Sequence, residues 1–353
     1  MMNFTSDNWS GVHPAIADNL SRHATGVARA YGQSDLDKRI EAKFCELFER
    51  EVAVFFVGTG TAANSLALAA LNRPGGVVFC HSEAHIIKDE CGAPEWFTGG
   101  ARLQPVTGNS GKINPAKLIR ELSHFRPDFI HAGQPMAVSI TQATEVGTVY
   151  QPDEIETIAE ICRSKSIPLH MDGARIANAL AASDISPADM TWKRGVDALS
   201  FGGTKNGCWC AESMVFFDPS AAKDLPYIRK RAAQLFSKTR FIAAQLEAYL
   251  QDDLWLQLAA AANEKAANLA RILSADTRCR LAWETGANEV FVVVKESLAD
   301  IWIHAGLGCY KWPAPEDIAD DLAKDEIILR LVTSFATTDA EIRNFEQLVQ
   351  RGA

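Results

Sequence analysis

Residues 197–207 read Asp-Ala-Leu-Ser-Phe-Gly-Gly-Thr-Lys-Asn-Gly, so that Lys205 follows directly after a short apolar run that predicts a strand. One unit earlier, residues 168–175 read Pro-Leu-His-Met-Asp-Gly-Ala-Arg, and a second apolar run ends near Asp172. Ligands of open α/β sheets collect at the carboxyl ends of the strands. A lysine whose pKa is lowered there can form an imine with a carbonyl, and the neighbouring glycines would let a flat ligand approach the backbone. These two segments indicate an α/β fold with a site at one edge of its sheet.

A second glycine-containing segment, residues 55–64, reads Phe-Phe-Val-Gly-Thr-Gly-Thr-Ala-Ala-Asn and combines a strand, a turn and a helix start. Backbone N–H groups at a helix N-terminus bind anions, and threonine hydroxyls add donors. The segment therefore predicts a phosphate site made by Gly58, Thr59, Gly60 and Thr61. The same letters fit the dinucleotide fingerprint GxGxxA, with Glu83 as a possible ribose partner, so this segment alone leaves a nicotinamide cofactor open.

The order of the apolar runs indicates how the chain is organised. Between residues 52 and 217 short apolar runs alternate with helical patterns, which is typical of βα units around a mostly parallel sheet. The expected strands are 53–57, 77–80, 103–107, 129–132, 168–171, 198–201 and 213–217, and a crossover helix is expected to begin near Pro152. A long helical stretch follows, then strand-like runs at 289–294 and 327–333, and a capping box from Thr338 to Glu341. We expect an N-terminal segment (1–30), a large α/β domain (31–240) that carries the ligand site and a smaller α+β domain (241–353).

Composition and charge narrow the class of protein. The chain has 353 residues, of which 47% are hydrophobic and 22% charged, as in a globular protein of about two domains. The net charge of −9 gives a long-range field of the wrong sign for nucleic acid or an anionic membrane. The 8 cysteines form no disulfide framework, and no apolar run approaches the roughly 20 residues that span a bilayer, so a cytoplasmic protein with reduced thiols is expected. No metal site is expected, because the His81-x-x-x-His85 pattern lacks an evident third ligand.

The phosphate segment, the strand-end aspartate and the strand-end lysine form a combination that a dinucleotide does not explain. Pyridoxal phosphate needs all three: a helix N-terminus for its phosphate, a carboxylate for its ring nitrogen and a lysine for its aldehyde. His85 follows the next strand and could lie over the ring. Taken alone, Asp172 could cap a helix, Arg175 could be solvated and His85 could be structural, so the hypothesis depends on the combination.

The sequence resembles the threonine aldolases among the fold-type I pyridoxal phosphate enzymes, in the group that includes the aromatic amino acid β-eliminating lyases. The resemblance spans nearly the whole chain and rests on residues 4–8, 31–32, 58–64, 85–92, 144–150, 170–175, 201–207 and 329–333. It implies a fold-type I transferase-like α/β fold with a mostly parallel central sheet and a smaller α+β C-terminal domain. It further implies that Lys205 bonds to the cofactor aldehyde, that Asp172 faces the ring nitrogen and that His85 stacks on the ring.

The resemblance also implies residues for the substrate and for a partner subunit. Ser6, Arg175 and Arg330 would bind the substrate carboxylate, a bidentate task that suits arginine, and Arg175 would also lie beside the cofactor. A homodimer or homotetramer is expected, with Tyr31, Arg229 and Arg231 as the candidate residues across its interface.

The implied activity is the cleavage of L-threonine, L-allo-threonine and related β-hydroxy-α-amino acids to glycine and an aldehyde, as in a low-specificity threonine aldolase. Some aldolases carry a histidine just before the glycine of the segment that here reads Ala-Thr-Glu-Val-Gly at 143–147. Its absence leaves the threo or erythro preference open and makes His85, or a water that it holds, the expected base. The alternatives are a β-eliminating lyase on the same fold, an NAD-dependent dehydrogenase, and a non-catalytic pyridoxal phosphate protein.

Overall fold

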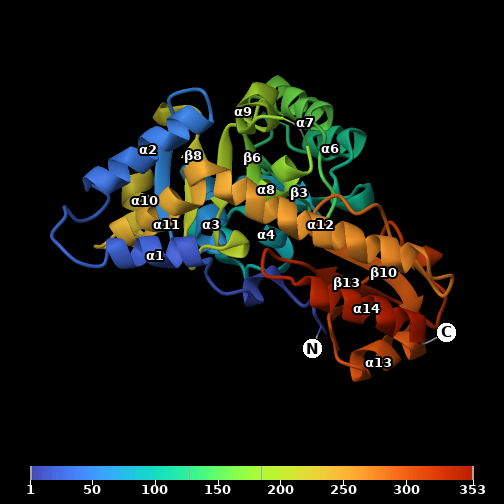
Figure 1. Ribbon diagram of the computed structural model, residues 1–353. Helices are drawn as coiled ribbons and strands as arrows, with labels where there is room; N and C mark the ends of the chain where they lie inside the picture. Colours follow the sequence, from blue (N-terminus) through green and yellow to red (C-terminus); the bar gives the residue numbers. More distant parts are fainter. Residues whose placement is uncertain (1, 127, 184, 352–353) are drawn as a thin grey trace.

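The computed structural model describes residues 2–126, 128–183 and 185–351. Figure 1 shows a large body around one sheet and a smaller C-terminal body, connected by the long helix α12 (Leu254–Ser274) that crosses the molecule in orange. In the part of the chain so described, no helix is both long and apolar enough to cross a membrane.

The large body contains a seven-stranded sheet in the order β2-β8-β7-β6-β5-β3-β4. Its strands are β2 (Ala53–Val57), β3 (Gly76–His81), β4 (Arg102–Val106), β5 (Gln134–Thr141), β6 (Leu169–Gly173), β7 (Ala198–Gly202) and β8 (Glu212–Phe216). All neighbouring pairs from β4 to β7 are parallel, whereas β8 runs antiparallel to both β7 and β2. The strands β2, β3, β5, β6 and β7 therefore all end at the same edge of the sheet.

Helices pack on both faces of this sheet because its strands alternate between two apolar cores. Val77 and Phe79 of β3 belong to one apolar core, which they share with most helices of the large body. Val78 and Cys80 belong to a second core, which they share with the helix that follows β2. The helices of the large body are α1 (Pro14–Arg22), α2 (Asp35–Leu47), α3 (Gly60–Ala70), α4 (His85–Lys88), α5 (Ala93–Phe97), α6 (Pro115–Ser123), α7 (Pro152–Ser164), α8 (Ile176–Ala181), α9 (Pro187–Met190), α10 (Leu225–Arg231) and α11 (Arg240–Leu250). The predicted crossover helix is confirmed as α7, which begins at Pro152.

One predicted strand is wrong. Residues 129–132 form an exposed turn, in which Ile130 is 90% exposed, and the strand begins only at Gln134. Pro135, which lacks an N–H donor, lies at the start of β5, where one missing donor is tolerated. The other six predicted strands of the sheet are confirmed to within one residue at either end, except that β6 ends two residues later than predicted.

The smaller body contains a four-stranded antiparallel sheet in the order β12-β13-β10-β9. Its elements are β9 (Cys279–Leu281), β10 (Glu289–Lys295), α13 (Glu296–His304), β12 (Tyr310–Trp312), β13 (Glu326–Val332) and α14 (Asp339–Arg351). The predicted capping box is confirmed, because the N–H of Thr338 donates to Glu341 Oε2 (2.9 Å) and the N–H of Glu341 donates to Thr338 Oγ1 (3.2 Å). The chain start joins this body, since β1 (Met2–Asn3) pairs with β11 (Leu307–Gly308).

The two apolar cores meet along α12. Trp255 and Ala259, near the start of the helix, belong to the core of the large body, whereas Leu269 and Leu273, near its end, belong to the core of the small one. One uninterrupted helix thus contributes to both cores, and the domain boundary near residue 240 stays a prediction.

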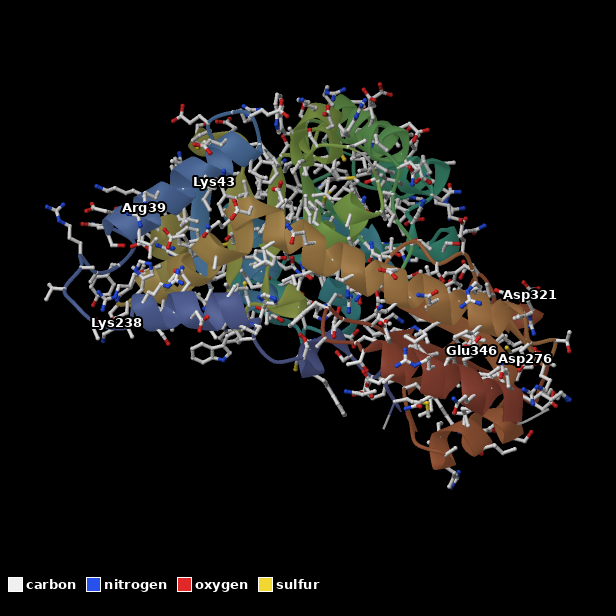
Figure 2. The ribbon with its side chains drawn as sticks, viewed as in Figure 1. Arg39, Lys43, Lys238, Asp276, Asp321 and Glu346 are labelled. Carbon is white, nitrogen blue, oxygen red and sulfur yellow. The ribbon has the colours of Figure 1, made fainter. Side chains whose placement is uncertain are left out.

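Exposed charged side chains lie on the outside of both bodies. Figure 2 labels Arg39, Lys43 and Lys238 on the large body and Asp276, Asp321 and Glu346 on the small one. Buried charges lie where the two bodies meet, and these form the site described next.

Candidate active site

Four predicted site segments meet at one edge of the large sheet. Asp172 is the residue before the last one of strand β6, and it is paired with Thr141 of β5 and Ser200 of β7. Lys205 follows β7 in a short turn (Thr204–Asn206), and His85 begins α4 after β3. Helix α3 begins directly after β2. Because these strands end on the same side, residues more than 100 positions apart in the sequence come together.

Asp172 is a buried carboxylate without a positive partner. Its side chain accepts two hydrogen bonds, from the N–H of Ala174 to Oδ1 (3.0 Å) and from Asn64 Nδ2 to Oδ2 (2.9 Å). Asp172 is 2% exposed, and it forms no ion pair with any residue that the structure describes. Burial of a carboxylate is costly when only neutral groups stabilise it, so a cationic ring nitrogen would fit here.

A hydrogen-bonded chain connects Asp172 with His85. Asn64 Nδ2 also donates to Glu90 Oε1 (2.9 Å), and His85 Nδ1 lies 2.8 Å from the same Glu90 oxygen. Burial tends to lower the pKa of His85, but Glu90, Glu145 and Asp172 raise it above its ordinary value. The Glu90 contact fixes the ring through Nδ1 and leaves Nε2 for the site.

Lys205 is half-buried, and its amine has no hydrogen-bond or ion-pair partner among the residues described. The glycines beside it have reasons within the chain that differ from the expected one. A Cβ on Gly203 would lie 2.6 Å from the Ala211 carbonyl oxygen, and Gly207 has a φ of +106°. Close packing and backbone conformation, rather than a ligand, therefore require glycine on both sides of Lys205.

The predicted phosphate segment divides into two parts. The N–H of Gly58 donates to Gln234 Oε1 (3.1 Å), and Thr59 caps α3 by accepting from the N–H of Ala62 (3.1 Å). The N–H groups of Gly60 and Thr61 have no acceptor in the described part of the chain. These two donors at the start of an 11-residue helix are therefore the ones available to an anion.

Two buried arginines are joined by carboxylates of the chain itself. Arg175 donates from Nε to Asp7 Oδ2 (2.7 Å) and from Nη2 to Asp7 Oδ1 (3.1 Å), and its Nη1 lies 3.4 Å from Glu289 Oε2. Arg330 donates from Nε (2.9 Å) and Nη2 (2.6 Å) to Glu289 Oε1 and lies over the ring of Trp312. The structure thus brings Arg175 and Arg330 together, and both already hold carboxylates.

The arginine next to Asp7 lowers the pKa of its carboxyl group. Burial alone would raise its pKa, but Arg175 and Lys205 lower it to about 2. Ser6, the adjacent residue, accepts from the N–H of Asn8 (3.2 Å) and is half-buried. The start of the chain therefore reaches the site, with Asp7 as its buried charge.

Sequence reasoning missed Glu145 and Glu289. Glu145 follows β5, the strand between those that carry His85 and Asp172, and it is 7% exposed. Its position after an apolar strand was a signal that could have identified it. Glu289 begins β10 and is paired with Val332 on the strand that carries Arg330, a register that only the folded sheet reveals.

The residues predicted at a subunit interface differ in their surroundings. Arg229 is buried, and its Nη1 donates to the Phe56 carbonyl oxygen (3.2 Å). The guanidinium of Arg229 lies over the Phe55 ring. Tyr31 is 49% exposed, and Arg231 is also exposed. The roles of these three residues across an interface stay predictions.

His81, the first histidine of the HxxxH pattern, has a structural role. Its Nε2 lies 3.1 Å from the Gly108 carbonyl oxygen, and its Nδ1 accepts from the N–H of Glu83 (3.0 Å). Across the described ranges, no three His, Cys, Asp or Glu side chains form a group that could hold a metal ion.

Known proteins resemble this chain over most of its length. Residues 3–297 match the model of the beta-eliminating lyase family. The low specificity L-threonine aldolase of Pseudomonas aeruginosa is 45% identical over 293 residues, which cover 83% of this chain and 84% of that protein. An enzyme of the same name from a Pseudomonas species is 44% identical over the same shares. The structure of a Leishmania major threonine aldolase superposes with a TM-score of 0.91 at 28% identity and covers 99% of both chains. The chain therefore belongs to the beta-eliminating lyase family and, within that family, to the threonine aldolases.

Proposed function

We propose that this protein is a pyridoxal phosphate-dependent aldolase that cleaves L-threonine, L-allo-threonine and related β-hydroxy-α-amino acids to glycine and an aldehyde. One observation carries the proposal: three groups at a single sheet edge lack partners of the kinds that this cofactor provides. Asp172 lacks a cation, the Lys205 amine lacks an acceptor, and the N–H groups of Gly60 and Thr61 lack an anion. The arginine pair next to them supports an amino acid as the substrate.

The residues of the site fit the cofactor. Lys205 would hold its aldehyde, Asp172 its ring nitrogen, and the start of α3 its phosphate, while His85 would cover the ring. When bound, pyridoxal phosphate supplies a conjugated ring that accepts the electron pair left on Cα when a bond to that carbon breaks. Asp172 keeps the ring nitrogen protonated, because a buried carboxylate favours a cation beside it.

The clamp residues would orient the substrate. Arg175 and Arg330 can offer a substrate carboxylate the donors that Asp7 and Glu289 do not occupy, with Ser6 beside them. A fixed carboxylate decides which bond to Cα breaks, because it sets the rotation about the bond between the amino nitrogen and Cα. With the Cα–Cβ bond so placed, a base that takes the β-hydroxyl proton releases the aldehyde.

A substrate panel tests this activity and separates it from β-elimination, which the family name suggests as the second candidate. The purified protein with added cofactor should form glycine from threonine, allo-threonine and phenylserine. Release of pyruvate from serine or tryptophan, with no glycine from threonine, would identify a β-eliminating lyase instead. Borohydride reduction followed by peptide mapping should place the cofactor on Lys205, and a label on another lysine would contradict the assignment.

We further propose a homodimer or homotetramer in the cytoplasm. A cavity of about 1090 Å³ between α3, α5 and α10 is lined by Trp96, Tyr227 and Arg231, and both aromatic residues are largely exposed. Large exposed aromatic groups are enriched at protein interfaces. Light scattering should give a mass of at least twice 38.5 kDa, whereas a monomer would contradict this proposal.

A further inference from the structure

Glu145 is a buried carboxylate that no group of the chain satisfies. It is 7% exposed, and its oxygens take part in no hydrogen bond or ion pair with the residues described. The other acidic residues of the site all have such partners: Asp7 binds Arg175, Glu90 binds Asn64, and Glu289 binds Arg330. The oxygens of Glu145 are not among the side-chain atoms that are fully enclosed without a partner, so this carboxylate keeps contact with solvent and is available to a ligand or a reacting group.

The loop that carries Glu145 is held firmly. The N–H of Gln142 donates to the Asp172 carbonyl oxygen (2.8 Å), and the N–H of Thr144 donates to that of Thr148 (2.9 Å). Gly147 has a φ of +75°, and a Cβ there would lie 2.9 Å from atoms of Glu289, so the loop packs closely on β10. With its backbone fixed on both sides, Glu145 cannot move far to find a partner.

The surroundings of Glu145 connect it with the reacting part of the site. Four charged or titratable groups act on it: Lys205, Arg175, His85 and Glu289. Burial raises its pKa above the ordinary value, while the first three of these groups oppose that effect and Glu289 adds to it. Its strand, β5, lies between β3 and β6, whose ends carry His85 and Asp172. Glu145 therefore lies at the edge of the sheet between the strand ends that carry His85 and Asp172, and the charges of Lys205 and Arg175 act on it.

We propose that Glu145 is the catalytic base that accepts the β-hydroxyl proton of the substrate, directly or through one water. This inference rests on the proposed aldolase activity and names a residue for its central step. The carboxylate takes the proton, the electron pair of the O–H bond becomes the second C–O bond of the aldehyde, and the Cα–Cβ bond breaks. The electron pair of that bond remains on Cα, in conjugation with the bound cofactor, until Cα takes up a proton to give glycine.

His85 is then a stacking residue rather than the base. Its Nδ1 is engaged by Glu90, which lies on the chain of hydrogen bonds to Asp172, so the ring is oriented as part of the cofactor support. The two assignments differ in what each substitution removes. Loss of the base abolishes only the step that involves a hydroxyl, whereas loss of a stacking group impairs every reaction that the cofactor supports.

The test uses two reactions of the holoenzyme. Cleavage of threonine needs a base for the hydroxyl, but exchange of the glycine α-proton in D₂O, followed by NMR, does not. Glu145→Gln should reduce cleavage about 100-fold, within the range typical of a general base, and should change exchange by less than about threefold. It should also remove the fall in kcat/KM at acid pH, and Glu145→Asp should restore that fall together with part of the cleavage. His85→Asn should reduce both reactions to a similar extent.

Controls make the outcomes distinct. The absorbance band of the lysine-bound cofactor should form to the same extent in Glu145→Gln as in the wild type, which shows an intact site without reference to activity. Glu284→Gln, an exposed neighbour on the adjacent loop, should leave both reactions unchanged. Equal losses of cleavage and exchange in Glu145→Gln, or a selective loss of cleavage in His85→Asn alone, would overturn the assignment. A wild type that exchanges glycine but does not cleave threonine would contradict the proposed function itself.

Discussion

The two sides of the site satisfy their charges in different ways. The cofactor side comprises Asn64, His85, Glu90, Asp172 and Lys205, and the clamp side comprises Asp7, Arg175, Glu289 and Arg330. On the clamp side two arginines meet two carboxylates, so that the formal charges cancel within the chain. On the cofactor side Asp172 and Lys205 form no ion pair with each other or with any other described residue. The charges of Asp172 and Lys205 on the cofactor side can therefore be paired by a ligand, whereas the charges on the clamp side are already paired within the chain.

This difference indicates how each side is assembled. The cofactor-side residues all lie on the large sheet or on helices and turns that begin at its edge, so the cores on the two faces of this one sheet position them. The clamp residues come from the chain start, the end of β6, and strands β10 and β13 of the small sheet. Because its parts belong to two bodies, the clamp needs its internal ion pairs to hold them together before any substrate binds. A substrate carboxylate must therefore share the arginines with Asp7 and Glu289.

The largest effect is expected on the cofactor side. Asp172→Asn removes the negative charge that we propose for the ring nitrogen of the cofactor but keeps the shape of the side chain. Turnover of threonine should fall about 1000-fold, since one transition-state charge interaction is worth roughly 3–4 kcal/mol. Cofactor content, measured by absorbance, should fall much less. Turnover near that of the wild type would contradict a catalytic role and would leave Asp172 only the structural role of accepting the hydrogen bond of the Ala174 N–H group.

A smaller effect is expected on the clamp side. Arg330→Lys loses the forked contact with Glu289, and it should raise the Michaelis constant for threonine about 100-fold, because loss of a buried charged pair costs about 3 kcal/mol. The matched control is Arg280→Lys, an exposed arginine of the same sheet that is paired with Glu326 and should change the constant little. An unchanged constant in Arg330→Lys would refute its place in the clamp.

The clamp should also affect stability in a pH-dependent way. The pKa of Asp7 is about 2 in the folded protein and 3.8 ordinarily, so its contribution is fully present above pH 4 and is lost as the pH falls towards 2. Asp7→Asn should lower the free energy of unfolding by about 2 kcal/mol at pH 7, and the difference from the wild type should shrink between pH 4 and pH 2. Urea unfolding at several pH values measures this. Asp18→Asn, a change at an exposed aspartate of α1, serves as the control, and a difference for Asp7→Asn that does not vary with pH would contradict the role given to its charge.

The smallest effect is expected on the stability of the protein when Gly60, one of the backbone donors of the cofactor side, is replaced. A Cβ on Gly60 would meet no atom of the chain within 4 Å, and Gly60 has no positive φ. Gly60→Ala should therefore stabilise the protein slightly, by up to about 1 kcal/mol, because alanine is the better helix former. Thermal unfolding of the apoprotein measures this effect. Gly203→Ala, whose Cβ would collide with the Ala211 carbonyl oxygen, should instead be clearly destabilised, and equal results for the two variants would contradict this distinction.

The sequence alone predicted most of the sheet and the proposed cofactor residues, because both predictions depend on local patterns. Apolar runs between helical segments predicted six of the seven strands, and polar residues at their ends marked Asp172, Lys205 and His85. The rule that parallel strands end at one edge then brings these residues together without knowledge of any side-chain contact. The failure at residues 129–132 has the same origin, since a short apolar run has no period that distinguishes an exposed turn from a strand.

Only the tertiary structure decided how the charges are paired. The sequence could assign Arg175 and Arg330 to a substrate carboxylate, but it could not show that Asp7 and Glu289, 282 positions apart, already hold them. The position of Glu145 after an apolar strand could have marked it as a candidate, but the sequence could not show that its carboxylate lacks a partner. Whether a buried carboxylate has a partner depends on which distant segments meet around it, and local propensity and periodicity do not contain that information.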